Sequence, residues 1–229
     1  RILEVGAGGG TLAVWLAHEG AEVVGIDVSH GILDVARRRA DLSGVGDACR
    51  FVHTPIEEFA PELFPDAEGG FDAIIGNNVV HHFDRDLAMA RLASLLRPGA
   101  IAVFCEPMLF VPEPVRAIRY SSLVTRRFPP HTHTEDEASL NDGDLGVMAR
   151  HFRHVDWKPF QLTARLQNFV ELSDAWWNRL EGLDRRLLAG VPASRRLCRM
   201  AVITLGLPRA APPGKPPSSF GHDPQERSL

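Results

Sequence analysis

The sequence has few cysteines, no long apolar run and no excess of positive charge. Its three cysteines, Cys49, Cys105 and Cys198, form no Cys-x-x-Cys pair, which disfavours a disulfide framework and favours a reducing compartment. No apolar stretch approaches the roughly 20 residues of a membrane span, so we expect a cytoplasmic protein without a membrane segment. Twenty-five basic residues against 29 acidic ones give a net charge of −4, which argues against nucleic-acid binding through bulk positive charge.

What the sequence does contain is ordinary for a globular protein. Of its 229 residues, 45% are hydrophobic and 24% are charged. A chain of this length forms one or two domains and buries a sizeable core without disulfide or metal staples. Because Arg1 is followed at once by a strand pattern at Ile2–Val5, we expect that the whole protein continues before Arg1.

The first hundred residues alternate between strand and helix patterns. Short apolar runs predict strands, and amphipathic stretches between them predict helices. This alternation predicts a single α/β domain, a Rossmann-like, doubly wound sheet with helices on both faces. The expected strands are 2–5, 21–26, 50–53, 71–76 and 100–105, and the expected helices are 11–19, 29–39 and 84–96, the last closed by Arg97-Pro98-Gly99.

The pattern changes after residue 105. Prolines crowd residues 106–137, which we expect to form a cap or lid over an acceptor pocket. Six further prolines make 208–229 a disordered tail, which leaves 1–207 as the folded domain. The other expected elements are helices at 115–124, 142–152 and 168–188 and strands at 155–163 and 200–205.

A glycine-rich loop joins the first strand to the first helix. Glu4-Val5-Gly6-Ala7-Gly8-Gly9-Gly10 holds four glycines in five positions, as expected where a backbone turns sharply against a ligand. The spacing is Gly-x-Gly-x-Gly, because Thr11 stands where a dinucleotide fingerprint has its third glycine. No Gly-Lys-Ser/Thr follows, so the loop is not a phosphate-binding P-loop.

An acidic residue closes the second strand. Asp27 lies 21 residues after Gly6, where a carboxylate can accept hydrogen bonds from both hydroxyls of a ribose. Alone it could equally be an acid that favours the following helix N-terminus. Together with the glycine loop it favours a nucleoside ligand.

These features resemble a known family. The segments ILEVGAGGG, FDAIIGNNVVHHF and LLRPGA, with Asp27 between the first two, are similar to class I S-adenosylmethionine (SAM)-dependent methyltransferases over about residues 1–105. The resemblance implies a mostly parallel, seven-stranded sheet with an antiparallel edge strand, completed by the elements after residue 105. It also implies SAM as the cofactor and a small molecule as the methyl acceptor.

The resemblance assigns a cofactor role to residues of four loops. It implies that Asp27 binds the ribose and that the residue after it packs on the adenine. The loop after the third strand would meet the adenine amino group, and the end of the fourth strand the methionine amino group. The residues so assigned are Glu4, Gly6, Ala7, Gly8 and Gly10 on the methionine side, then Asp27, Val28, Thr54, Pro55, Ile56 and Asn77.

Two adjacent histidines follow the fourth strand. Histidine is a common proton acceptor in enzymes, and His81 and His82 stand at the ligand-binding edge of the sheet, so either could remove a proton from an acceptor hydroxyl. The alternative is a histidine that only caps the turn or supports the cofactor. Glu106, at the end of the fifth strand, is a second candidate for contact with the acceptor.

Other polar clusters point to no further site. His131 and His133 lack a second pair of ligands, and Asp72 begins its strand at the wrong end for a catechol-type magnesium site, so we expect no metal. Arg37–Arg39 reads as a solvated helix face. Trp176 and Trp177 are expected in the core or in a homodimer contact.

The sequence therefore predicts transfer of a methyl group from SAM to an oxygen, nitrogen or carbon atom of a small molecule. Two alternatives stay open. One is an NAD(P)- or flavin-dependent oxidoreductase, against which Thr11 counts. The other is a SAM-binding module without catalysis, because its cofactor loop would look the same.

Overall fold

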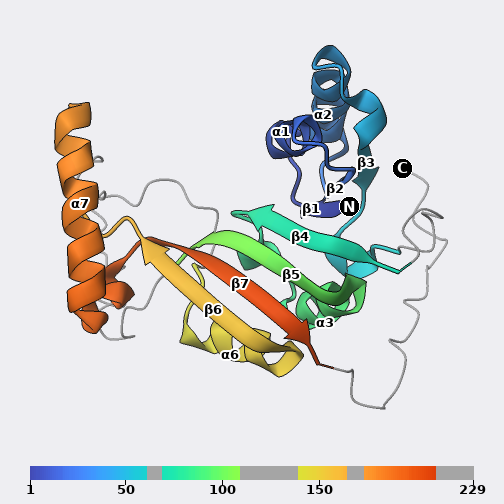
Figure 1. The fold of residues 1–229 in the computed structure, drawn as a ribbon. Helices are drawn as coiled ribbons and strands as arrows, with labels where there is room; N and C mark the ends of the chain where they lie inside the picture. Colours follow the sequence, from blue (N-terminus) through green and yellow to red (C-terminus); the bar gives the residue numbers. More distant parts are fainter. Residues whose placement is uncertain (61–68, 109–138, 164–172, 210–229) are drawn as a thin grey trace, which may run out of the picture.

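A computed structural model describes residues 1–60, 69–108, 139–163 and 173–209 (Figure 1). These residues form a seven-stranded sheet with the strand order β3-β2-β1-β4-β5-β7-β6. Most of the predicted cap, the predicted helix at 115–124 and nearly all of the predicted tail lie outside the described residues. Within the described part of the chain, no helix combines the length and the apolarity needed to span a membrane.

The first five strands pair in parallel and alternate with helices, as predicted. Crossovers on both sides of β1 place β2 and β4 beside it, so the sheet reverses its winding there. The elements are β1 (Ile2–Val5), α1 (Thr11–His18), β2 (Val23–Asp27), α2 (His30–Leu42), η1 (Gly46–Ala48), β3 (Cys49–His53), η2 (Ile56–Glu58), β4 (Phe71–Asn77), η5 (Val80–His82), α3 (Arg85–Leu95) and β5 (Leu96–Pro107).

The second half of the chain completes the sheet. It contributes α6 (Asp142–His151), β6 (Phe152–Phe160), α7 (Asp174–Gly190), η7 (Pro192–Leu197) and β7 (Met200–Pro208). β7 runs antiparallel to both β5 and β6 and lies between them. The antiparallel pairing is therefore at the predicted end of the sheet. The strand that reverses direction is β7, and β6 forms the edge.

Several predicted boundaries were wrong, and strand pairing explains two of them. Arg97-Pro98-Gly99 does not end the helix as a separate turn, because α3 stops at Leu95 and β5 starts at the next residue. Leu96 pairs with Phe71, so pairing with β4 draws this segment into the strand. β6 begins at Phe152, three residues earlier than predicted, because Phe152 is buried and pairs with Pro208 of β7.

The core has two parts, one on each face of the sheet. Successive strand residues point to opposite faces, and Val23 and Val24 accordingly belong to different clusters. The smaller cluster packs α1 and α2 against β2 and β3, and the larger one packs α3 and α6 against the other face of β2 and against β1, β4, β5, β6 and β7. Figure 1 shows these helix pairs on opposite sides of the sheet, the arrangement of a doubly wound fold.

We expect the larger cluster to dominate stability. Phe104 is fully buried at the centre of β5, and truncation to alanine should lower the free energy of unfolding by about 3–5 kcal/mol. Leu42, which is 82% exposed, provides the control, and Leu42→Ala should change it by about 0.5 kcal/mol or less. Urea unfolding followed by circular dichroism measures both values. A Phe104→Ala variant as stable as Leu42→Ala would contradict this description of the core.

Candidate functional site

A cavity of about 460 Å³ opens at the carboxyl edge of the parallel strands, where the winding of the sheet reverses. Its volume is within the range of small-molecule sites. Eight of the residues assigned from the sequence line it, namely Gly6, Asp27, Val28, Thr54, Pro55, Ile56, Asn77 and His82. Val5, Ile26, Glu57, Asn78, Val79 and Phe83 complete the wall.

The glycine loop lies too close to its neighbours for side chains. Gly6 has φ +70°, and a Cβ there would lie 2.6 Å from Val79 Cγ2. At Gly10, which has φ +73° and precedes α1, a Cβ would lie 2.8 Å from the Cβ of Ala36. Left-handed backbone and missing space both require glycine. The loop is thereby pressed against the turn after β4 on one side and against α2 on the other.

Asp27 connects this loop to α2. Its two oxygens accept hydrogen bonds from the backbone N–H groups of Gly8 and Ser29, each at 2.9 Å. The carboxylate is half-buried and lines the cavity, and each oxygen keeps a lone pair for a further donor. Gly8, Gly10 and Ala7 are not in the cavity wall. They shape the loop behind it.

Glu4 is buried beneath the loop and is not part of the cavity wall. Burial raises the pKa of Glu4 to about 7, a hydrogen bond from the backbone N–H of Ala13 opposes this shift, and the Asp27 carboxylate adds to it. Oε2 of Glu4 has no hydrogen-bond partner. Near neutral pH a large share of the Glu4 side chains is therefore protonated, because ionisation leaves a poorly compensated charge.

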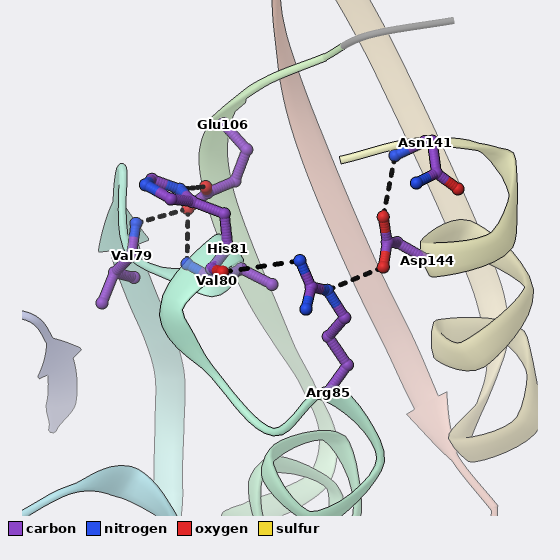
Figure 2. Close-up of polar contacts among 7 residues, drawn as sticks. All are labelled: Val79, Val80, His81, Arg85, Glu106, Asn141 and Asp144. Carbon is purple, nitrogen blue, oxygen red and sulfur yellow. Dashed lines mark hydrogen bonds and ion pairs between the residues drawn. The ribbon is translucent and has the colours of Figure 1, made fainter. Parts of the chain in front are cut away.

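The predicted acceptor contact of Glu106 was wrong. Glu106 is fully buried, and its carboxylate binds the turn after β4 instead of facing the cavity (Figure 2). Oε1 accepts hydrogen bonds from the N–H groups of Val79 at 2.8 Å and Val80 at 3.0 Å. Oε2 lies 2.9 Å from Nδ1 of His81, and because a carboxylate accepts, this imidazole nitrogen donates. A buried charge is thus compensated by three donors.

The two histidines have different surroundings. His81 is only 7% exposed and is held by Glu106, whereas His82 is exposed and lines the cavity. Their ring centroids lie 4.1 Å apart. Asn78 reaches φ +53° immediately before this turn, a conformation that asparagine tolerates better than most residues. The wall beside His82 therefore carries two exposed amides, those of Asn77 and Asn78.

Sequence reasoning missed some contacts here. Arg39 does not belong to a solvated face, because it donates to the carbonyl of Gly9 and, at 2.7 Å, to the hydroxyl of Thr11. Glu57, a cavity residue, accepts from the N–H of Asp84 at 3.1 Å. Arg39 gave no signal in the sequence, while Glu57 directly follows the predicted residues Pro55 and Ile56.

His131 and His133 lie outside the residues that the structure describes. Among the described residues, no group of three or more histidine, cysteine or acidic side chains could hold a metal ion. Trp176 is 53% exposed on α7. The expectation that it is a core residue was therefore wrong, and the alternative of a homodimer contact stays a prediction.

The fold, the glycine loop and the cavity at the edge of the sheet define a Rossmann-like protein. Residues 2–99 match the family model described as a methyltransferase domain. A ubiquinone biosynthesis O-methyltransferase of Ruegeria pomeroyi is 36% identical over 135 residues, which are 58% of this chain and 51% of that protein. Residues 2–99 are therefore a methyltransferase domain, and the chain is similar to class I SAM-dependent methyltransferases.

Solved structures share the fold. Phosphoethanolamine N-methyltransferase 2 of Haemonchus contortus, in complex with SAM, has a TM-score of 0.53 at 18% identity, covering 91% of this chain and 49% of that one. The [4+2]-cyclase SpnF has a TM-score of 0.57 at 16% identity, covering 92% and 76%. At such identities the likeness concerns the fold. The chain spans about half the length of the curated relative from R. pomeroyi.

The buried Glu4 predicts a dependence of stability on pH. Between its ordinary pKa of 4.5 and about 7, the folded protein keeps the Glu4 proton and the unfolded chain does not. Stability is therefore lost as the pH rises through this window, by about 3 kcal/mol in all. Glu4→Gln removes this loss. The free energy of unfolding of the variant minus that of the unmodified protein should therefore be larger at pH 8 than at pH 5.

Urea unfolding without cofactor at both pH values measures the effect. Glu19→Gln, which changes an exposed carboxylate at the end of α1, is the control and should behave alike at pH 5 and pH 8. If Glu4→Gln shows the same stability difference from the unmodified protein at both pH values, Glu4 is not protonated in the folded state.

Proposed function

We propose that this protein transfers a methyl group from SAM to a small-molecule acceptor, and that the acceptor atom is a hydroxyl oxygen. The observation that carries the proposal is the junction of the glycine loop with Asp27 in the wall of the cavity. It combines close backbone approach with a carboxylate that has free lone pairs, the two requirements of a nucleoside at this edge.

The chain's residues fit SAM. Asp27 would accept hydrogen bonds from the ribose hydroxyls, and Val28, which is 69% exposed, offers an apolar surface to the adenine. Thr54 and Ile56 close the same side of the cavity. Gly6 and Asn77 line the opposite part, where the methionine portion would lie, with the Gly6 backbone free of any side chain.

SAM supplies a sulfonium methyl, which is already electrophilic, so the protein has mainly to align the acceptor and exclude water. A hydroxyl acceptor must also lose its proton. His82 lines the cavity and would accept that proton as the new O–CH3 bond forms and the S–CH3 bond breaks. His81 would then hold the turn, because Glu106 fixes its ring.

The choice of a hydroxyl acceptor rests on two supports. An imidazole in the cavity suits removal of a phenol or alcohol proton, a step that transfer to an amine or carbon does not require in this form. The R. pomeroyi relative is named an O-methyltransferase. We further propose that the protein is cytoplasmic, supported by three cysteines that form no disulfide, and that it forms a homodimer, for which the exposed Trp176 on α7 is a candidate contact.

Loss of the Asp27 carboxylate should weaken cofactor binding. Asp27→Ala removes charge-assisted hydrogen bonds, so the Kd for S-adenosylhomocysteine should rise by about 10-fold or more. Asp34→Ala removes an exposed carboxylate of α2 and should bind like the unmodified protein. Isothermal titration with S-adenosylhomocysteine and with NAD measures both. Binding of NAD but not of S-adenosylhomocysteine would defeat the methyltransferase proposal.

Removal of the cavity imidazole should slow turnover. We expect His82→Ala to lower kcat on phenolic acceptors by about 100-fold or more, with the Kd for S-adenosylhomocysteine unchanged. Transfer of a radiolabelled methyl group from SAM into a set of phenols, amines and carbon acids measures kcat and the acceptor atom. His18→Ala, exposed at the end of α1, is the control. Normal turnover by both His82→Ala and His81→Ala would eliminate a histidine base.

A further inference from the structure

An ion pair behind the cavity continues the network around His81 (Figure 2). Arg85, at the start of α3, places Nε 2.7 Å from Oδ1 of Asp144 in α6. This contact is an ion pair without an aligned hydrogen bond. The end of the Arg85 guanidinium donates to the His81 carbonyl at 3.4 Å. That carbonyl belongs to the peptide group that joins His81 to His82, so Arg85 contacts the backbone that carries the cavity imidazole.

Asp144 is held independently of Arg85. Its Oδ2 accepts a hydrogen bond from the Asn141 N–H at 2.9 Å, as part of a capping box at the start of α6. The side chain of Asp144 is 11% exposed and that of Arg85 28%. Solvent and salt screen such a pair less than a surface pair. The position of α6 therefore determines where the guanidinium lies.

The network returns to the strand from which Glu106 comes. Pro107 accepts a hydrogen bond from the N–H of Leu140 at 2.9 Å, and Met108 and Leu140 form a parallel bridge. Leu140 directly precedes Asn141, the N-cap of α6. The contacts close into a ring that runs through Glu106, His81, Arg85, Asp144, Asn141, Leu140 and Pro107.

This ring holds the turn η5 from both ends. Glu106 binds the N–H groups at its start and the His81 ring, and Arg85 binds the carbonyl between His81 and His82. Arg85 is not part of the cavity wall. Its one contact with the turn is with the peptide group that orients His82.

We propose that Arg85 is a positioning residue for His82 and takes its own position from Asp144. The proposal rests on the proposed function, because His82 matters only if it contacts the acceptor. The guanidinium fixes the peptide plane before His82, and the capping box fixes the guanidinium. A small displacement of a proton acceptor is costly to catalysis, since the reacting atoms must align within a fraction of an ångström.

Enzyme kinetics on the full chain test this role. Arg85→Met should lower kcat on the order of tenfold and leave the KM for SAM unchanged, because the cofactor wall is untouched. Arg85→Lys keeps the charge near Asp144 and should recover part of the loss. Asp144→Asn keeps the oxygen that accepts from Asn141 and removes the ion pair, so its effect should not add to that of Arg85→Met.

A matched control is available on the same sheet. Arg97→Met removes an arginine that pairs with Asp72 at the opposite end of β4, and it should leave kcat unchanged. Circular dichroism melting confirms that each variant is folded. If Arg85→Met does not fold, Arg85→Lys and Asp144→Asn carry the comparison against Arg97→Met.

Hydrogen exchange tests the same inference without turnover. The His82 N–H donates to the Val79 carbonyl at 3.1 Å and closes the turn, so its exchange should accelerate in Arg85→Met and stay unchanged in Arg97→Met. If the unmodified protein transfers no methyl group, the proposed function is wrong. The exchange of the His82 N–H still tests whether Arg85 holds the turn, because it does not depend on turnover. Unchanged exchange with unchanged kcat in Arg85→Met, or additive effects with Asp144→Asn, would overturn the positioning role.

Discussion

The candidate site depends on one buried carboxylate. Glu106 is fully enclosed at the end of β5, and a carboxylate taken out of water is tolerated only when its oxygens are filled by donors. Val79, Val80 and His81 supply those donors from the turn after β4. The need to compensate this charge thereby fixes the turn, and with it the place of His82 at the cavity.

The two sides of the cavity are built by different physical means. On the side of the glycine loop, Gly6 lies so close to Val79 that a Cβ is excluded, and Asp27 connects the loop to the start of α2 through two backbone N–H groups. On the side of His82, hydrogen bonds and an ion pair take over from steric packing. Val79 belongs to both, since its side chain faces Gly6 while its N–H binds Glu106. A substitution that displaces Val79 from one side should therefore change the geometry of the other side as well.

Much of this architecture could be predicted from the sequence. Short apolar runs and the helical stretches between them predicted the parallel half of the sheet, because strands that are buried on both faces are continuously apolar in sequence. The glycine spacing also predicted the cavity loop from local sequence, since a left-handed turn admits few residues other than glycine. Asp27 at the end of the second strand predicted the adjoining wall. Boundaries such as the start of β5 at Leu96 escaped prediction, because pairing with Phe71 decided them against the local proline and glycine signal.

The sequence by itself determined the doubly wound fold, the glycine loop that approaches the cavity and the pair of histidines after β4. Only the tertiary structure decided what each polar residue does. It buried Glu106, separated His81 from His82 by exposure, and brought Arg85 to Asp144 across 59 positions of the chain. The physical reason is that glycine and periodicity requirements are local, whereas the compensation of a buried charge uses whichever donors the packed strands and helices bring together.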